Sequence, residues 1–287
     1  MKCLQLYALT YLAPPPYRLA GKKAPLVRGS LAHVGQAHTF QRLLEEQHGR
    51  DPEVYYKPVD AIEIKAASML GDYPKHMVEH EQETAIAMTR EYEKHVPIQN
   101  AKYEILAVEE IVYFYIGGRT YTQRMDLLVR ERATGKKKIR DWKSSSSHNA
   151  NTLSGFAPSL QMQGYRWWGP QLFGDEWGGV EIGMLKAEPP YTPEVVQLQN
   201  APQLVARFPQ TVMDAEKRIE ALIAEGRPWH LWPPTSDELV CVHRYGRCEG
   251  WDPCLWGKEP PAGGLVQFGA ASGVAPGDII KIGGGSS

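Results

Sequence analysis

The chain has 287 residues, 43% of them hydrophobic and 23% charged, which is typical of a globular protein with a sizeable core. The formal net charge of −1 excludes a strongly basic DNA-coating protein, although it allows an enzyme whose carboxylates offset a basic groove. No segment approaches the roughly 20 apolar residues needed to span a bilayer. The apolar run near the N-terminus is interrupted and is followed by three prolines, so we expect no signal peptide and a cytoplasmic location.

The first third of the chain is predicted to be helical. One helix is expected over residues 30–47, with Ser30 as its cap and Gly49 just beyond its end. A second is expected over residues 77–95, ending before Pro97.

Three successive antiparallel strands are predicted next. Residues 103–116 and 120–131 are rich in β-branched and aromatic residues and are separated by Gly117-Gly118. A third strand is expected over residues 136–145, after a turn at Gly135. A helix over 158–174, a strand over 178–188 and a helix over 203–225 follow, the last one containing Pro209. This order indicates an α/β fold with a central mixed β-sheet flanked by helices.

Two carboxylates and a lysine are expected to meet on neighbouring strands. Asp126 lies late in the second strand, and Asp141 and Lys143 lie two apart in the third, on one face of it. A divalent cation would remove the repulsion between the two carboxylates, and Mg²⁺ suits such a site. The ammonium group of Lys143 would offset charge on a phosphate. Charged residues at the ends of a hairpin are also often simply solvated.

These residues and three further segments resemble the PD-(D/E)XK nuclease superfamily, and specifically its RecB-like exonuclease branch. Gly29 to His33 is similar to a Gly-x-x-x-His helix motif whose histidine is a metal ligand. Glu109 follows the pattern of a first core strand, and Gln161 to Tyr165 resembles a Gln-x-x-x-Tyr helix motif. The resemblance covers residues 29–165 and implies a restriction-endonuclease-like core. It departs from the family at Thr122-Gln123-Arg124, where a glycine is common, and at Ser144, where threonine is common.

The resemblance implies a set of functional residues. It makes His33, Asp126 and Asp141 ligands of Mg²⁺ or Mn²⁺. The catalytic set that it implies comprises Glu109, Asp126, Asp141, Lys143, Gln161 and Tyr165.

Four cysteines lie near the two ends of the chain: Cys3, Cys241, Cys248 and Cys254. Some RecB-like nucleases hold an iron–sulfur cluster with one N-terminal and three C-terminal cysteines, so the resemblance implies a [4Fe–4S] cluster that staples the two ends together. The spacing of the last three is wider than usual in that group. A tetrahedral Zn²⁺ site or free thiols are the alternatives. The resemblance thus predicts one nuclease domain over residues 1–258 and a flexible tail over 259–287.

Two groups are possible DNA contacts. Lys136 to Lys138 and Arg140 form a basic run that would contact phosphates or else be a solvated hairpin tip. Tyr165, Trp167 and Trp168 would stack on bases, although at least one tryptophan is expected in the core.

The sequence therefore predicts a metal-dependent DNA exonuclease acting on single strands or DNA ends in recombination, repair or phage replication, with a helicase or recombination partner. A CRISPR-adaptation nuclease that trims DNA before integration is an alternative that only neighbouring genes would separate. A non-catalytic DNA-binding module on the same fold is another alternative. A type II restriction enzyme is less favoured because the Gln-x-x-x-Tyr helix and the cysteines do not fit it. The sequence leaves cleavage polarity and oligomeric state open.

Overall fold

The computed structural model describes residues 24–71, 73–146 and 156–226, together with five short strands elsewhere in the chain. The chain forms two compact units. One contains residues Ala24–Pro209 and Pro276–Ser287, and the other contains Met1–Lys23 and Gln210–Ala275. The single domain over 1–258 and the flexible tail over 259–287 stay predictions. No helix in the described part of the chain is long and apolar enough to cross a membrane.

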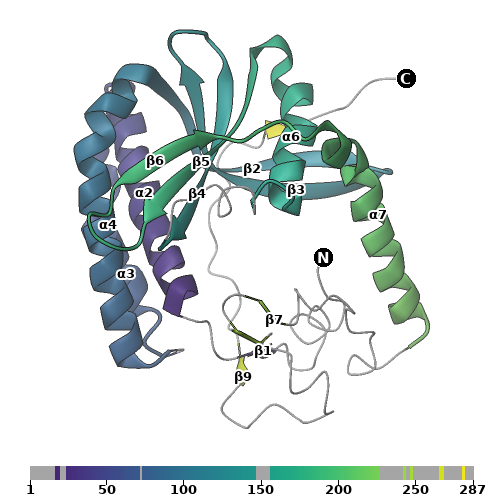
Figure 1. Ribbon diagram of the computed structural model, residues 1–287, viewed down its shortest axis with the longest axis horizontal. Coiled ribbons are helices and arrows are strands. Elements are labelled where there is room, and N and C mark those ends of the chain that lie inside the picture. Colours follow the sequence, from purple (N-terminus) through teal and green to yellow (C-terminus); the bar gives the residue numbers. More distant parts are fainter. Residues whose placement is uncertain are drawn as a thin grey trace. The chain divides into compact units, whose positions relative to one another are not determined.

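The larger unit is built on a six-stranded mixed sheet in the order β10-β2-β3-β4-β5-β6 (Figure 1). Its strands are β2 (Tyr103–Ile116), β3 (Arg119–Glu131), β4 (Lys137–Ser145), β5 (Trp177–Lys186), β6 (Pro193–Gln197) and β10 (Ile280–Lys281). Strands β2, β3 and β4 form an antiparallel meander, β4 and β5 are parallel, and β6 is antiparallel to β5. The three predicted antiparallel strands and the strand expected over 178–188 are confirmed. Strand β6 was not predicted.

Helices flank the sheet. They are α2 (Ala24–Gln47), α3 (Pro58–Ala67), α4 (Lys75–Lys102), α6 (Leu160–Phe173) and α7 (Pro202–Ala224), with short 3₁₀ helices at Pro52–Val54 and Gly174–Glu176. Figure 1 shows α2, α3 and α4 grouped together and α6 apart from them, in the connection between the parallel strands β4 and β5. The α/β class and the mixed sheet flanked by helices are thereby confirmed.

Two helices extend beyond their predicted ends. Helix α2 begins at Ala24 because Pro25 in a first turn costs no hydrogen bond and because Val27 is already fully buried. Helix α4 continues through Pro97 to Lys102. The last carbonyl groups of α4 are satisfied by Arg132, whose backbone N–H donates to Lys102 O (2.9 Å) and whose Nε donates to Asn100 O (3.2 Å). Helix α3 was not predicted.

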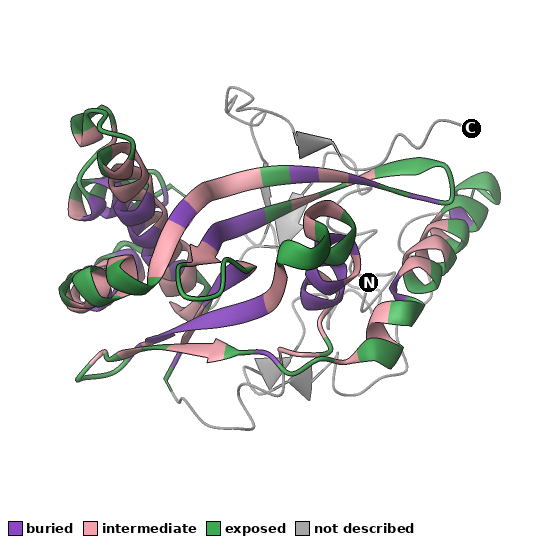
Figure 2. Ribbon diagram, turned by 90° about the horizontal axis from the view of Figure 1, so that it is seen from above, coloured by how far each residue is buried: buried purple, intermediate pink, exposed green. Residues whose placement is uncertain are grey.

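The main core lies between the sheet and helices α2 and α4, where Figure 2 shows the buried segments of these elements. Its centre is Trp142 of β4, which is stacked on Phe40 of α2 (ring centroids 5.5 Å apart) and meets Tyr92 of α4 edge-on (5.1 Å). Gly183 lies opposite Trp142 in β5, and a Cβ there would overlap the indole ring. Because side chains alternate along a strand, Asp141 and Lys143 point to the face of β4 opposite to that of Trp142.

The smaller unit joins segments from both ends of the chain. Strand β1 (Tyr17–Leu19) pairs antiparallel with β9 (Leu265–Gln267), and β7 (Val242–His243) pairs with β8 (Gly246–Arg247).

Candidate metal centre and active site

Three potential metal ligands converge from three elements of the larger unit. His33 comes from α2, Glu109 from β2 and Asp126 from β3, and one ligand atom of each lies within 4.8 Å of the others. His33 Nε2 is 2.8 Å from Asp126 Oδ2, and His33 Nδ1 is 3.3 Å from Glu109 Oε1. The group combines one imidazole with two carboxylates, a donor set that suits Mn²⁺ or Mg²⁺.

Local structure explains how His33 and Glu109 reach this point. Gly29 lies one turn before His33, and a Cβ on it would be 3.3 Å from Ser144 Oγ of β4, which shows how closely α2 approaches the sheet. Glu109 has a positive φ of 56°, a rare conformation for a residue other than glycine. A strained backbone conformation persists only where the surrounding structure holds it in place, and such positions are common at functional sites.

Asp141 lies beside this group, paired with Lys143. The Lys143 ammonium group is in contact with Asp141 Oδ2, and the Tyr165 hydroxyl donates to Asp141 Oδ1 (3.4 Å). Asp141 stays a predicted metal ligand, and Glu109, which the sequence predicts as a catalytic residue, converges with His33 and Asp126.

The pKa values of these groups reflect burial and mutual repulsion. Burial, and then the charge of Asp126, raise the pKa of Asp141 to about 6, although Lys143 opposes the change. Burial also raises the pKa of Glu109, against the influence of His33 and Arg124. Burial lowers the pKa of His33, but the hydrogen bond and charge of Asp126, with Glu109 and Asp141, outweigh it and raise that pKa. The site therefore concentrates negative charge that a cation would stabilise.

Two buried oxygen atoms support the same conclusion. Glu109 Oε1 and Asp141 Oδ2 are inaccessible to solvent and form no hydrogen bond with the described residues, although each lies near a cationic side chain. Buried polar atoms are rarely left without a hydrogen-bonding partner. Unsatisfied carboxylate oxygens next to three converging ligands fit a site for a divalent cation.

Helix α6 brings the predicted glutamine and tyrosine to the same site. Ser159 caps the helix by accepting a hydrogen bond from Met162 N (3.3 Å). Gln161 Nε2 donates to Tyr165 Oη (3.1 Å), and Lys143 Nζ donates to Gln161 Oε1 (3.3 Å). The chain Lys143–Gln161–Tyr165–Asp141 is therefore closed by hydrogen bonds and fixes the lysine beside the carboxylates.

Three contacts were not anticipated from the sequence. The Arg124 guanidinium group is 3.1 Å from Glu109 Oε2, and Gln123 Nε2 donates to Gln161 O (2.7 Å). The backbone N–H of Trp142 donates to Asp126 Oδ2 (2.8 Å). Arg124 could have been found from the alternation of strand residues, since it shares a face of β3 with Asp126.

The basic run of β4 is engaged within the protein. Lys137 pairs with Glu176 (2.6 Å), and Lys138 pairs with Glu131 (3.1 Å). Arg140 is 1% exposed and pairs with Glu181 (2.9 Å), so it is buried and does not face solvent. Its expected phosphate contact is therefore incompatible with its position, because the ion pair lies inside the fold.

The aromatic residues that were predicted to stack on DNA bases include residues of the core. Trp168 is fully buried and donates to Gln123 Oε1 (2.8 Å), which confirms the expectation of at least one core tryptophan. Tyr165 is also fully buried.

The expected cluster ligands Cys3, Cys241, Cys248 and Cys254 all lie outside the described residues, so the [4Fe–4S] cluster and its Zn²⁺ alternative stay predictions.

Comparisons with known proteins add little. No protein-family model matches the chain, and no curated protein matches it significantly. Among solved structures, the chain is similar to one described as SSO0001, with 15% sequence identity and a TM-score of 0.25 over 52% of this chain and 69% of that one. A similarity at that level carries no argument about function.

Proposed function

We propose that this protein is a metal-dependent DNA nuclease that hydrolyses phosphodiester bonds with Mg²⁺ or Mn²⁺. One observation carries the proposal. Side chains from α2, β2, β3, β4 and α6 form a single cluster of acids, a histidine, a lysine and a hydrogen-bonded Gln-Tyr pair. A preference for DNA ends or single strands rests on the resemblance of these motifs to RecB-like exonucleases.

The residues divide into ligands and positioning groups. His33, Asp126 and Asp141 would hold the cation, together with Glu109, which converges with His33 and Asp126. When bound, the cation supplies Lewis-acid activation of a water molecule and offsets negative charge on the phosphate. Lys143 presents its ammonium group next to the same phosphate.

The supporting contacts explain why this lysine is suited to the reaction. Gln161 and Asp141 hold the ammonium group from two sides, so little conformational entropy is lost when a substrate binds. The single hydroxyl proton of Tyr165 is shared between Asp141 Oδ1 (3.4 Å) and the closer Arg124 O (2.9 Å), which links α6 to β3. A site whose groups are held in advance stabilises a transition state without reorganisation.

The proposal is tested with purified protein and DNA labelled at the 5′ or 3′ end, single- or double-stranded, with Mg²⁺, Mn²⁺ or EDTA. We expect metal-dependent release of short products, and a loss on the order of 100-fold or more for Asp126→Asn. Asp60→Asn, an exposed acid of α3, is the matched control and should retain full activity.

Two results would contradict the proposal. One is intact DNA with either metal under conditions in which the protein is folded. The other is full activity of Asp126→Asn. Metal binding without cleavage would favour the non-catalytic DNA-binding module.

A further inference from the structure

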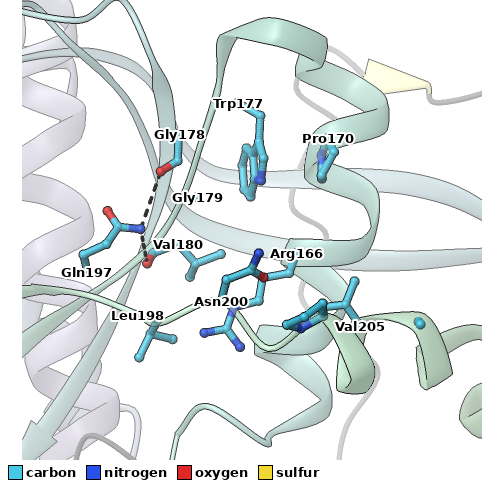
Figure 3. A pocket seen from close by; sticks show the side chains of 12 residues that line it. Arg166, Pro170, Trp177, Gly178, Gly179, Val180, Gln197, Leu198, Asn200 and Val205 are labelled. Atoms are coloured by element: carbon cyan, nitrogen blue, oxygen red, sulfur yellow. Dashed lines mark hydrogen bonds between the residues drawn. The ribbon is translucent and has the colours of Figure 1, made fainter.

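A cavity lies beside helix α6, and its lining residues are different from those of the metal centre. It has a volume of about 530 Å³ and is bounded by α6, the start of β5, the end of β6 and the start of α7. Figure 3 shows Arg166, Trp177, Val180, Leu198 and Val205 around it. Tyr165 faces the metal centre, whereas the next residue, Arg166, lines this cavity. Its volume lies in the range of small-molecule sites.

Arg166 is a buried cation with no counterion among the residues that the structure describes. Its residue is 6% exposed, and its guanidinium group donates to two backbone carbonyl oxygens, Ala157 O (3.1 Å) and Gln199 O (2.6 Å). Within the described ranges no carboxylate forms an ion pair with it, and burial lowers its pKa. A buried charge is costly unless it is paired. An anionic ligand would supply the missing partner.

The guanidinium group also has the capacity to bind such a ligand. Arginine has five N–H donors, and two of them are used by the carbonyl groups of Ala157 and Gln199. Nε–H and one further N–H on each of Nη1 and Nη2 remain, and a pair of guanidinium N–H groups can bind two oxygens of a phosphate at once. The two carbonyl bonds hold the group in place before a ligand arrives.

The walls of the cavity suit a flat group. Trp177 is stacked on Phe173 (ring centroids 5.9 Å apart, planes 14° apart), which fixes its ring. Val180 and Leu198 add buried apolar surface. Gln197 Nε2 donates to Val180 O (3.0 Å) and Gly178 O (3.5 Å) and so braces the start of β5, as the dashed lines in Figure 3 show.

We propose that this cavity is a binding site for a nucleoside monophosphate. The phosphate binds Arg166, and the base lies along Trp177 between the apolar walls. A mononucleotide combines the two features that the cavity demands, a doubly accepting anion and a planar heterocycle. The proposal is independent of the proposed nuclease activity, since none of the lining residues belongs to the metal centre.

The binding test uses isothermal titration calorimetry of the whole protein in EDTA, which removes metal-dependent binding at the other site. The three probes are dAMP, deoxyadenosine and inorganic phosphate. We expect dAMP to bind at least about tenfold more tightly than either fragment, because charge-assisted hydrogen bonds and base stacking both contribute. Absence of dAMP binding, or equal binding of dAMP and either fragment, overturns the proposal.

Two variants locate the binding. Ala206→Trp adds bulk at an exposed position of the cavity wall and leaves Arg166 intact, whereas Arg166→Met removes the cation. Both should weaken dAMP binding at least about tenfold. Arg130→Met, at a partly exposed pair with Glu104, is the control. Unchanged dAMP binding in a folded Ala206→Trp protein would place the nucleotide elsewhere and overturn the assignment.

Discussion

Asp141 is a carboxylate that the fold holds at a cost. Its side chain is 0% exposed, and burial followed by the charge of Asp126 raises its pKa to about 6. At pH 7.5 the group is ionised in both the folded and the unfolded protein, but ionisation is less favourable in the folded state. The functional charge therefore lowers the stability of the metal-free protein.

Replacing this charge should stabilise the metal-free protein. We expect Asp141→Asn to raise Tm in EDTA at pH 7.5 by about 2–4 °C, which corresponds to about 1 kcal/mol for a domain of this size. The same variant should lose DNA cleavage. Differential scanning fluorimetry checks the first effect, with Asp60→Asn as the exposed control. A lower Tm for Asp141→Asn would show that the pair with Lys143 outweighs the cost of burial.

Lys143 should act on the reaction rather than on metal binding. It contacts Asp141 and Gln161 and is not one of the three converging ligands. We expect Lys143→Met to reduce cleavage on the order of 100-fold, because one preorganised charge is lost. The rise in Tm that Mn²⁺ produces should persist. Lys65→Met, at an exposed position of α3, is the control, and unchanged cleavage by Lys143→Met contradicts the assigned role.

At the residue scale the sequence predicts which side chains meet but not all of their contacts. The strand pattern places Asp126, Asp141 and Lys143 near one another, whereas His33 and Glu109 were added by the resemblance to RecB-like nucleases. Glu109 meets His33 from a backbone with a positive φ, which no residue pattern signals. The role of Gln123 depends on how α6 packs against β3, and that of the Trp142 backbone N–H depends on how β4 lies beside β3.

Helix α2 carries His33, and its position depends on close packing against α4. A Cβ on Gly35 would lie 2.5 Å from Thr89 Oγ1 and 2.8 Å from Ile62 Cδ1. We expect Gly35→Ala to lower Tm by about 3–6 °C, because overpacking costs about 1–3 kcal/mol and exceeds the gain in helix propensity. Cleavage should also fall, since His33 lies two residues away.

Gly29→Ala is the matched control in the same helix. A Cβ there would be 3.3 Å from the rotatable hydroxyl group of Ser144, while the helix gains about 1 kcal/mol in propensity. Its Tm should stay unchanged or rise. Equal losses of Tm in both variants would contradict the idea that overpacking at Gly35 causes the loss.

At the element scale the strands were more predictable than the helix ends. The β-branched and aromatic residues of β2 and β3, and the glycines between them, fix that hairpin locally. Helix α4 continues past Pro97, and its last carbonyl groups are satisfied by Arg132, a partner from a distant turn. Strand β6 has few residues and depends on pairing with β5, so its own sequence carries a weak signal.

For the whole molecule, binding of a cation at the metal centre should reverse the direction in which the stability of the folded protein changes with pH. The pKa values of Asp141, Glu109 and His33 are all raised in the folded protein. Each group therefore contributes stability at a pH below its unfolded pKa, and this contribution is lost as pH rises through the folded value. For Asp141 the window runs from the unfolded value of 3.8 to about 6, and for His33 it lies above the unfolded value of 6.5.

A bound cation requires the opposite protonation states, because carboxylates and neutral imidazole are the ligands. The Tm values in excess Mn²⁺ and in EDTA should therefore coincide near pH 5 and separate as pH rises to 8, with the Mn²⁺ sample the more stable. Scanning fluorimetry across this range measures the separation. In Asp126→Asn the difference between Tm in Mn²⁺ and Tm in EDTA should be smaller at every pH, while Asp60→Asn should reproduce the wild-type curves. A separation that is constant from pH 5 to 8 would mean that Mn²⁺ binds away from His33 and the raised carboxylates, since only those groups tie its binding to this pH window.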